Sequence, residues 1–202
     1  MKSSQDAKSR LGNLLLKEKF YVRKEVFMSS NWDKYFYNIC IAVASKSSCL
    51  SRHIGAILVK ENSIVSTGYN SPPRDVPHCG HDRFMKDVEL RSVVEQMQTS
   101  IDLVRFREEC PRKILGYVSG IHMELCPAQH AEINAIIDAA RKGVSIIGTT
   151  LYMNCIIPCK SCFGALINSR IVEIVVDDIK IYDKATQFLI SESKINIRKF
   201  EI

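Results

Sequence analysis

Four residues in two short segments of the chain could together carry out a metal-dependent hydrolysis. His130 is followed two residues later by Glu132, and Cys159 and Cys162 lie in a segment that begins with a proline, 158–162. One imidazole and two thiolates can bind Zn²⁺ and leave its fourth position open for water. Glu132 can move protons beside the metal without binding it. The sequence therefore predicts a catalytic zinc site with three protein ligands and one acid–base residue.

The spacing of these residues indicates which elements position them. Apolar residues recur at helical intervals over 129–142, so we expect a helix there with His130 and Glu132 in its first turn. Cys159 and Cys162 fit the first turn of a second helix, where the helix dipole favours thiolates. A CxxC segment alone is also typical of a redox pair or a closed structural zinc site. The upstream His-x-Glu pair favours the catalytic interpretation.

Composition limits the class of protein. The 202 residues suffice for one domain with a full core, and the net charge of +6 suits an anionic substrate without arguing for nucleic acid. Eight cysteines indicate metal sites before disulfides. The sequence has no apolar run of membrane-spanning length and its N-terminus does not resemble a signal peptide. We therefore expect a cytoplasmic protein that does not enter a membrane.

The rest of the chain predicts a single α/β domain over 31–202, preceded by an N-terminal extension of uncertain order, 1–30. A helix should run from about residue 31 to 45 and a strand pair should follow it. An insertion at about 80–125 lacks strand alternation and is expected to be helical over 82–107. Further strands and helices should alternate from 149 onward. This order predicts a three-layer α/β/α sandwich with a mixed sheet. The expected strands are 54–59, 63–69, 149–154, 171–176 and 195–200, and the last helix is 182–191.

Several motifs resemble those of the deoxycytidylate deaminases, in the zinc-dependent cytidine and deoxycytidylate deaminase family. They are the segment 49–56, Gly68-Tyr69-Asn70 followed by Pro73, the segment 130–136, and Leu151-Tyr152 before the two cysteines. The resemblance covers about 31–176 and implies a cytidine-deaminase-like fold. It also implies hydrolysis of dCMP to dUMP and ammonia, which supplies dUMP for thymidylate synthesis. Homo-oligomers and control by dCTP or dTTP are further family properties.

The resemblance places four residues at the substrate. Asn70 would bind a sugar hydroxyl, although a turn residue after a strand is the alternative for it. Arg74 would meet the phosphate, and the backbone of Ala131 would contact the base. Tyr152 would touch the sugar or phosphate, with core packing as the alternative.

Two replacements and an insertion depart from the family pattern. Ser71 and Asp75 stand where the family usually has glycine, and both add bulk where backbone must approach a phosphate closely. Asp75 also brings a negative charge, which the neighbouring Arg74 can offset. The long insertion follows Cys79. The replacements at Ser71 and Asp75 bear on the phosphate contact and on allosteric control.

Four further cysteines resemble the ligands of a second, structural zinc in a subgroup of the family. They are Cys49, Cys79, Cys110 and Cys126, with His78 or His122 as a possible replacement for one of them. A long polar insertion needs something to hold it, and a closed four-ligand zinc site would do so. The alternative is that Cys49 and Cys126 are buried small residues. For Cys40 and Cys155 we expect core packing.

Two other classes of function stay open. A deaminase of another cytosine or adenine substrate, either a nucleoside or a nucleic acid, could use the same zinc site. A nucleic-acid substrate predicts aromatic and basic residues around the mouth of the pocket. The loop that contains Arg74 is weak evidence for such a substrate by itself. A non-catalytic, zinc-stabilised protein of the competence type is the second alternative. Glu132 argues against it, because an inert site has no need of that carboxylate.

Overall fold

The computed structural model describes residues 31–96, 103–181 and 183–202. The extension 1–30 expected from the sequence lies outside these residues. One mixed sheet organises the main body, with strand order β2-β1-β3-β4-β5. β1 pairs antiparallel with β2 and β3, whereas β3, β4 and β5 run parallel. The strands are β1 (Gly55–Lys60), β2 (Ser63–Tyr69), β3 (Thr150–Ile156), β4 (Glu173–Asp178) and β5 (Asn196–Lys199).

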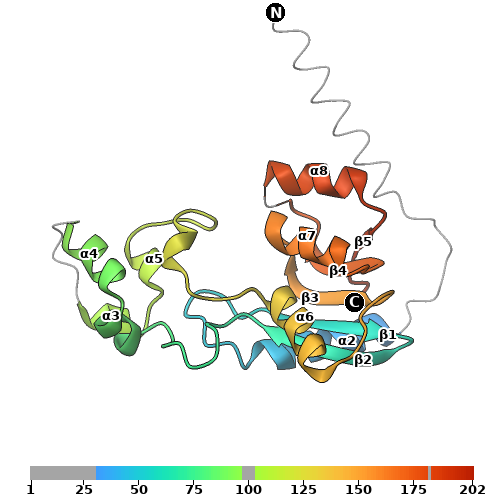
Figure 1. Ribbon diagram of the computed structural model, residues 1–202, viewed down its shortest axis with the longest axis horizontal. Helices are drawn as coiled ribbons and strands as arrows, with labels where there is room; N and C mark the ends of the chain where they lie inside the picture. The colour runs from blue at the N-terminus through green and yellow to red at the C-terminus, as the bar shows by residue number, and fades with distance from the viewer. Residues whose placement is uncertain (1–30, 97–102, 182) are drawn as a thin grey trace, which may run out of the picture.

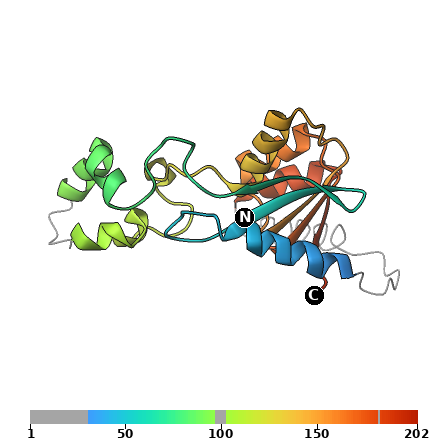
Figure 2. The same cartoon turned by 90° about the horizontal axis from the view of Figure 1, so that it is seen from below.

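Helices cover both faces of this sheet, as Figures 1 and 2 show. α2 (Asn31–Ala44) lies on one face, and α6 (Ala131–Lys142), α7 (Lys160–Asn168) and α8 (Lys184–Glu192) lie on the other. α7 and α8 connect parallel neighbours, since α7 links β3 to β4 and α8 links β4 to β5. The predicted three-layer α/β/α sandwich with a mixed sheet is therefore confirmed. Among the described residues no helix is long and apolar enough to cross a membrane.

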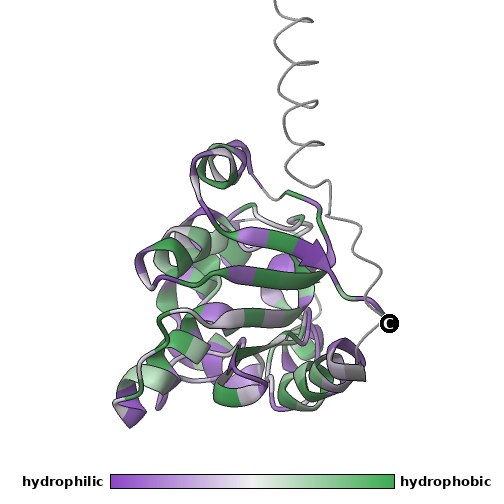
Figure 3. Ribbon diagram, turned by 90° about the vertical axis from the view of Figure 1, so that its right-hand side faces the viewer, coloured by the Kyte–Doolittle hydropathy of each residue, from purple (hydrophilic) through white to green (hydrophobic). Residues whose placement is uncertain are grey.

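Alternating side chains of the strands build two cores, one on each face of the sheet. Ala56 and Leu58 of β1 pack toward α6 and α7, while the intervening Ile57 packs toward α2 against Phe36. This follows from the two-residue period of a strand, which sends successive side chains to opposite faces. Both faces are apolar, so the middle residues of the central strands are buried, and green bands appear among the paler and purple ends of the strands in Figure 3.

The insertion forms a small lobe that projects away from the sheet (Figures 1 and 2). Its described part is helical, as expected, and it has a hydrophobic cluster of its own that includes Leu90, Phe106 and Leu125. Buried Arg83 ties this lobe together, because it donates to Asp87 at 3.0 Å and to the carbonyl of Leu125 at 2.6 Å. The elements of the lobe are α3 (His81–Lys86), α4 (Val88–Gln96), η1 (Leu103–Arg107), α5 (Pro111–Ile114) and η2 (Met123–Leu125).

Candidate metal and active site

The start of α6 positions the first part of the predicted site. His130 is the N-cap residue, with extended backbone, so it lies just outside the helix rather than in the first turn as expected. Glu132 is in the first turn and is buried. Gly68 of β2 lets the helix approach closely, because a Cβ there would lie 2.2 Å from the carbonyl oxygen of Ala131. The start of α6 can therefore pack directly on β2, because residue 68 has no side chain.

The start of α7 positions the two cysteines. Cys159 is the N-cap residue with extended backbone, and Cys162 lies inside the first turn and is buried. Asp183, which caps α8 by accepting from the N–H of Thr186, also accepts from the N–H of Lys160 at 3.0 Å. One carboxylate therefore fixes the N-termini of both helices, and with them the direction in which the thiols point.

The distances between the donor atoms suit a zinc ion. His130 Nδ1 lies 3.6 Å from the Sγ of Cys159 and 3.3 Å from that of Cys162, and all three donor atoms lie within 4.8 Å of one another. Ordinary Zn–N and Zn–S bonds meeting at a tetrahedral angle put nitrogen and sulfur about 3.5 Å apart. Within the described ranges this is the one such group of His, Cys, Asp and Glu side chains. The three predicted ligands therefore come together in a geometry that fits the metal.

The protons of the site also point to a cation. The Cys162 thiol donates to Cys159, which, with His130, lowers the pKa of Cys159 to about 4. The same contact raises the pKa of Cys162. The Cys159 contact also raises the pKa of His130. The ligand atoms of the three side chains thus hydrogen-bond to one another. A divalent ion bound between them can replace the protons that they share.

Glu132 lies beside these ligands. Its carboxylate is 3.9 Å from His130 Nδ1 and its side chain is almost fully buried. Burial raises its pKa above the ordinary value for a carboxyl, against the opposing charge of His130. A raised pKa suits a group that must both accept and release protons near neutral pH.

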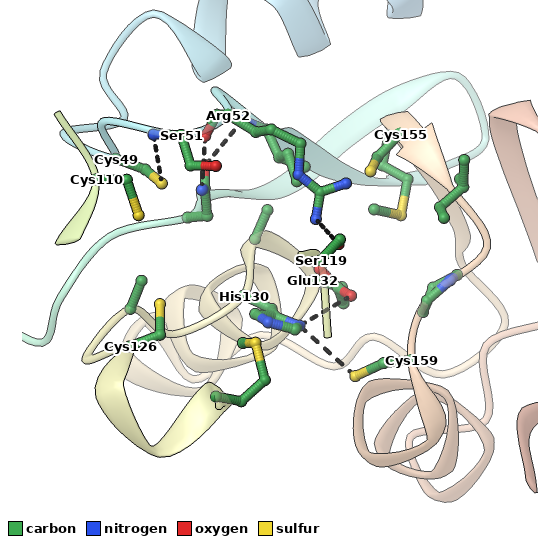
Figure 4. A pocket seen from close by; sticks show the side chains of 18 of the residues that line it. Cys49, Ser51, Arg52, Cys110, Ser119, Cys126, His130, Glu132, Cys155 and Cys159 are labelled. Carbon is green, nitrogen blue, oxygen red and sulfur yellow. Dashed lines mark hydrogen bonds and ion pairs between the residues drawn. The ribbon is translucent and has the colours of Figure 1, made fainter. Parts of the chain in front are cut away.

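One cavity opens over His130, Cys159 and Glu132 (Figure 4), while Cys162 is buried and is not part of its lining. One wall comes from the main body and includes Arg52, Ile54 and Cys155, and the other comes from the insertion and includes Arg112 and Ser119. The insertion therefore contributes directly to the cavity in which a substrate would meet the metal. Sequence reasoning had given it only a structural role.

Two of the predicted substrate residues line this cavity. Ala131 is one of them, and Asn70 is the other. Asn70 is buried, and its side chain already bonds two backbone groups, accepting from the N–H of Ile54 at 2.8 Å and donating to the carbonyl of Arg52 at 2.9 Å. This is the turn-stabilising alternative, and it leaves one amide N–H for a substrate.

The other two predicted substrate residues lie elsewhere. Tyr152 packs on the opposite face of the sheet against Phe36, with ring centroids 4.8 Å apart, because Met153 and Cys155 take the cavity face of β3. Tyr152 therefore takes the core-packing position that was its alternative, away from the cavity lining. Arg74 is exposed and is not part of the cavity lining.

The four remaining candidate ligands share the same cavity without forming a metal cluster. Cys49, Cys79, Cys110 and Cys126 all line it, and Figure 4 labels three of them, Cys49, Cys110 and Cys126. Their sulfurs are not gathered as tightly as those of the His130 site within the part of the chain that the structure describes. The second zinc therefore stays a prediction.

The two alternative histidine ligands and the last two cysteines have other contacts. His78 bonds the hydroxyl of Ser48, and His122 pairs with Glu124 at 2.7 Å. Cys40 is fully buried in the core, as expected. Cys155 packs against the core but also lines the cavity, which the sequence did not predict.

The comparisons with known proteins agree with this site. The model of the family described as "Cytidine and deoxycytidylate deaminase zinc-binding region" matches residues 30–177. The chain therefore belongs to the cytidine and deoxycytidylate deaminase family.

Individual relatives carry related names. The chain is 28% identical over 173 residues to the deoxycytidylate deaminase of Saccharomyces cerevisiae, and this covers 86% of the chain and 46% of that protein. It is 30% identical over 152 residues to the deoxycytidylate deaminase of Enterobacteria phage T4, covering 72% of the chain and 76% of that protein. The chain thus spans less than half the length of its yeast relatives.

A solved structure shows the same fold. The dCMP deaminase of the cyanophage S-TIM5, crystallised with dCMP and dUMP, superposes with a TM-score of 0.56 at 17% identity. The match covers 86% of the chain and 99% of the phage protein.

Proposed function

We propose that this chain binds Zn²⁺ and hydrolytically deaminates dCMP to dUMP and ammonia. The observation that carries the proposal is the meeting of His130, Cys159 and Cys162 beside a buried carboxylate, Glu132, where His130, Cys159 and Glu132 open onto one cavity. Family membership supports the same chemistry, and the deoxycytidylate deaminase relatives favour dCMP among the family's substrates.

In this proposal His130, Cys159 and Cys162 hold the zinc. The bound ion would lower the pKa of water and so supply a nucleophile at neutral pH. Glu132 would accept a proton from the attacking water and deliver it to N3 of the cytosine ring. The same carboxyl would then take the proton of the new hydroxyl on C4 and pass it to the amine, which leaves as ammonia while the C4 carbonyl forms. Its burial keeps bulk water away from these transfers.

The substrate is tested with a panel of cytosine compounds and ammonia detection. We expect kcat/KM for dCMP to exceed that for deoxycytidine by more than about a hundredfold, because a lost phosphate leaves charged donors unpaired. Equal rates on the two, or faster deamination of single-stranded DNA or tRNA, would overturn the nucleotide assignment. A zinc-loaded protein that releases no ammonia from any of them would instead be a binding protein.

The second zinc belongs to this proposal as well. Cys49, Cys79, Cys110 and Cys126 lie on one cavity, and burial raises the pKa of the Cys79 thiol, as do neighbouring Cys110 and Cys126, against the opposing effect of Arg83. Thiols this close to each other could be drawn together by a metal. Protein purified without chelator should contain about two zinc ions per chain. One ion would occupy the closed four-cysteine site and the other the open His130 site.

A cysteine variant separates the two sites. Cys110→Ser should lose one zinc and lower the urea midpoint, while the His130 site keeps its own ion. One zinc per wild-type chain would remove the structural site and leave these cysteines as packing residues.

Assembly and control are proposed from the family resemblance. We expect a homo-oligomer in the cytoplasm, with dCTP and dTTP as candidate effectors and no nucleic-acid partner. Light scattering of the purified chain, and dCMP turnover with and without each triphosphate, would test these points.

A further inference from the structure

The cavity contains two guanidinium groups, and they differ in what they bind. Arg112 donates to the carbonyl of Ile121 at 3.0 Å and to that of Val118 at 2.9 Å, so it holds the turn that carries Ser119. Arg52 makes one long contact, to the hydroxyl of Ser119 at 3.5 Å. Among the described residues it forms no ion pair. Most of its five N–H donors are therefore available to a ligand.

The backbone of Arg52 is held firmly although its side chain is exposed. Its carbonyl accepts from the side chain of Asn70 at 2.9 Å, and the same side chain accepts from the N–H of Ile54 at 2.8 Å. Asn154 fixes the next residue by donating to the carbonyl of His53 at 3.3 Å. These bonds anchor the chain just before β1, and in Figure 4 the Arg52 side chain extends along the cavity toward Ser119.

The surroundings of Arg52 suit an anion. Ser119 places its hydroxyl at the tip of the Arg52 guanidinium, and Ser51 lines the cavity as well. Glu132 is the one carboxylate in the lining, and it lies at the metal site. The lining thus holds one carboxylate, Glu132, and two guanidinium groups, of which Arg52 keeps most of its donors available.

We infer that Arg52, with the hydroxyl of Ser119 opposite it, binds the 5′-phosphate of the substrate nucleotide. The inference rests on the proposed dCMP deamination and names the residues that select the nucleotide over the nucleoside. A guanidinium matches a phosphate with two parallel hydrogen bonds, which a hydroxyl alone cannot provide. This role replaces that expected for Arg74, which is exposed outside the cavity. It also gives the insertion, through Ser119, a part in choosing the substrate.

The test compares Arg52→Ala with Arg74→Ala, the competing assignment, on dCMP and on deoxycytidine. We expect Arg52→Ala to lower kcat/KM for dCMP by about a hundredfold, mainly through KM, and that for deoxycytidine by less than about threefold. Arg74→Ala should change neither by more than about threefold. Arg52→Lys should retain part of the preference, since lysine keeps the charge without the planar fork.

A binding measurement gives a readout that does not depend on turnover. Calorimetric titration of the zinc-loaded proteins should show wild type binding dUMP more tightly than deoxyuridine, and Arg52→Ala binding both alike. Ser119→Ala should weaken dUMP binding by a smaller factor, up to about tenfold.

The outcomes separate this inference from the proposed function. If wild type prefers dCMP and Arg52→Ala keeps that preference, or loses activity equally on both substrates, the assignment of Arg52 is wrong while dCMP deamination stands. If Arg74→Ala abolishes the preference, the phosphate binds at the other loop. If wild type neither deaminates dCMP nor binds dUMP, the proposed function itself fails.

Discussion

The contact between β2 and α6 makes Gly68→Ala a sharp test of how the fold positions the site. A Cβ at residue 68 would lie 2.2 Å from the carbonyl oxygen of Ala131 and 2.2 Å from the backbone nitrogen of Ala135. Ordinary contacts begin near 3.4 Å, so strand and helix would have to separate by more than about 1 Å. β2 cannot yield easily, because residue 68 pairs with Ala56 of β1 in the sheet.

The expected magnitude follows from this displacement. Overpacking a core costs about 1–3 kcal/mol, and both clashes here are with backbone atoms, so we expect about 3 kcal/mol of lost unfolding free energy. Ligand distances in zinc sites stay within about 0.2 Å of their usual values, so a displaced ligand fits the metal less well. The same change should therefore weaken zinc binding, since His130 directly precedes the displaced helix.

Gly164→Ala in α7 is the matched control. A Cβ there has no atom within 4 Å, and the residue sits inside a helix, where alanine is favoured over glycine by about 0.5–1 kcal/mol. Urea unfolding at fixed zinc, with metal content measured on the same samples, should lower the midpoint for Gly68→Ala and leave or raise it for Gly164→Ala. A Gly68→Ala protein with the wild-type midpoint and full zinc content would refute the close packing of β2 on α6.

Two further predictions concern the proton shuttle and a helix cap. Glu132→Gln should keep its zinc but lose at least about a thousandfold in turnover, because one carboxyl serves several proton transfers; retention of a tenth of the activity would assign the base elsewhere. For Asp183, burial raises the pKa, but the hydrogen bonds from Thr186 and Lys160 outweigh it and hold the pKa below the ordinary value. The ionised group thus stabilises the fold above about pH 4, and this contribution is lost as the pH falls through the lowered pKa. Urea unfolding of wild type and Asp183→Asn should differ most near neutral pH and converge in acid; a constant difference would show that the charge is not involved.

The parts of the site that sequence predicted are those encoded locally. His130 and Glu132 are two residues apart and Cys159 and Cys162 are three apart, so each pair keeps its geometry once its helix begins. Apolar periodicity predicted α6 and the spacing of the two cysteines predicted α7, but neither showed that His130 would cap α6 from outside it. Helix ends depend on capping contacts, and the side chain of His130 makes none.

The parts that sequence missed depend on contacts between distant segments. Arg52 and Ser119 are 67 residues apart and meet only because the insertion folds back over the cavity. Arg52 lay within a family-like motif, which was the available signal, but nothing local gave the direction of its side chain. For Tyr152 the sequence showed the strand but not the face. Successive side chains of a strand point to opposite faces, so a shift of one residue along β3 decides which face a side chain takes. Its neighbours Leu151 and Met153 occupy the cavity side of the sheet, so Tyr152 must point to α2.

The central claim, that the zinc site of this chain deaminates dCMP, is tested most directly by measuring dUMP formation as zinc is added back to metal-free protein. Chromatography of the products and elemental analysis of the same samples would relate turnover to metal bound per chain. The account predicts that dUMP and ammonia appear in equal amounts, and that the rate rises with occupancy of the His130, Cys159 and Cys162 site. Protein with that site fully loaded, folded and still unable to form dUMP from dCMP would contradict it.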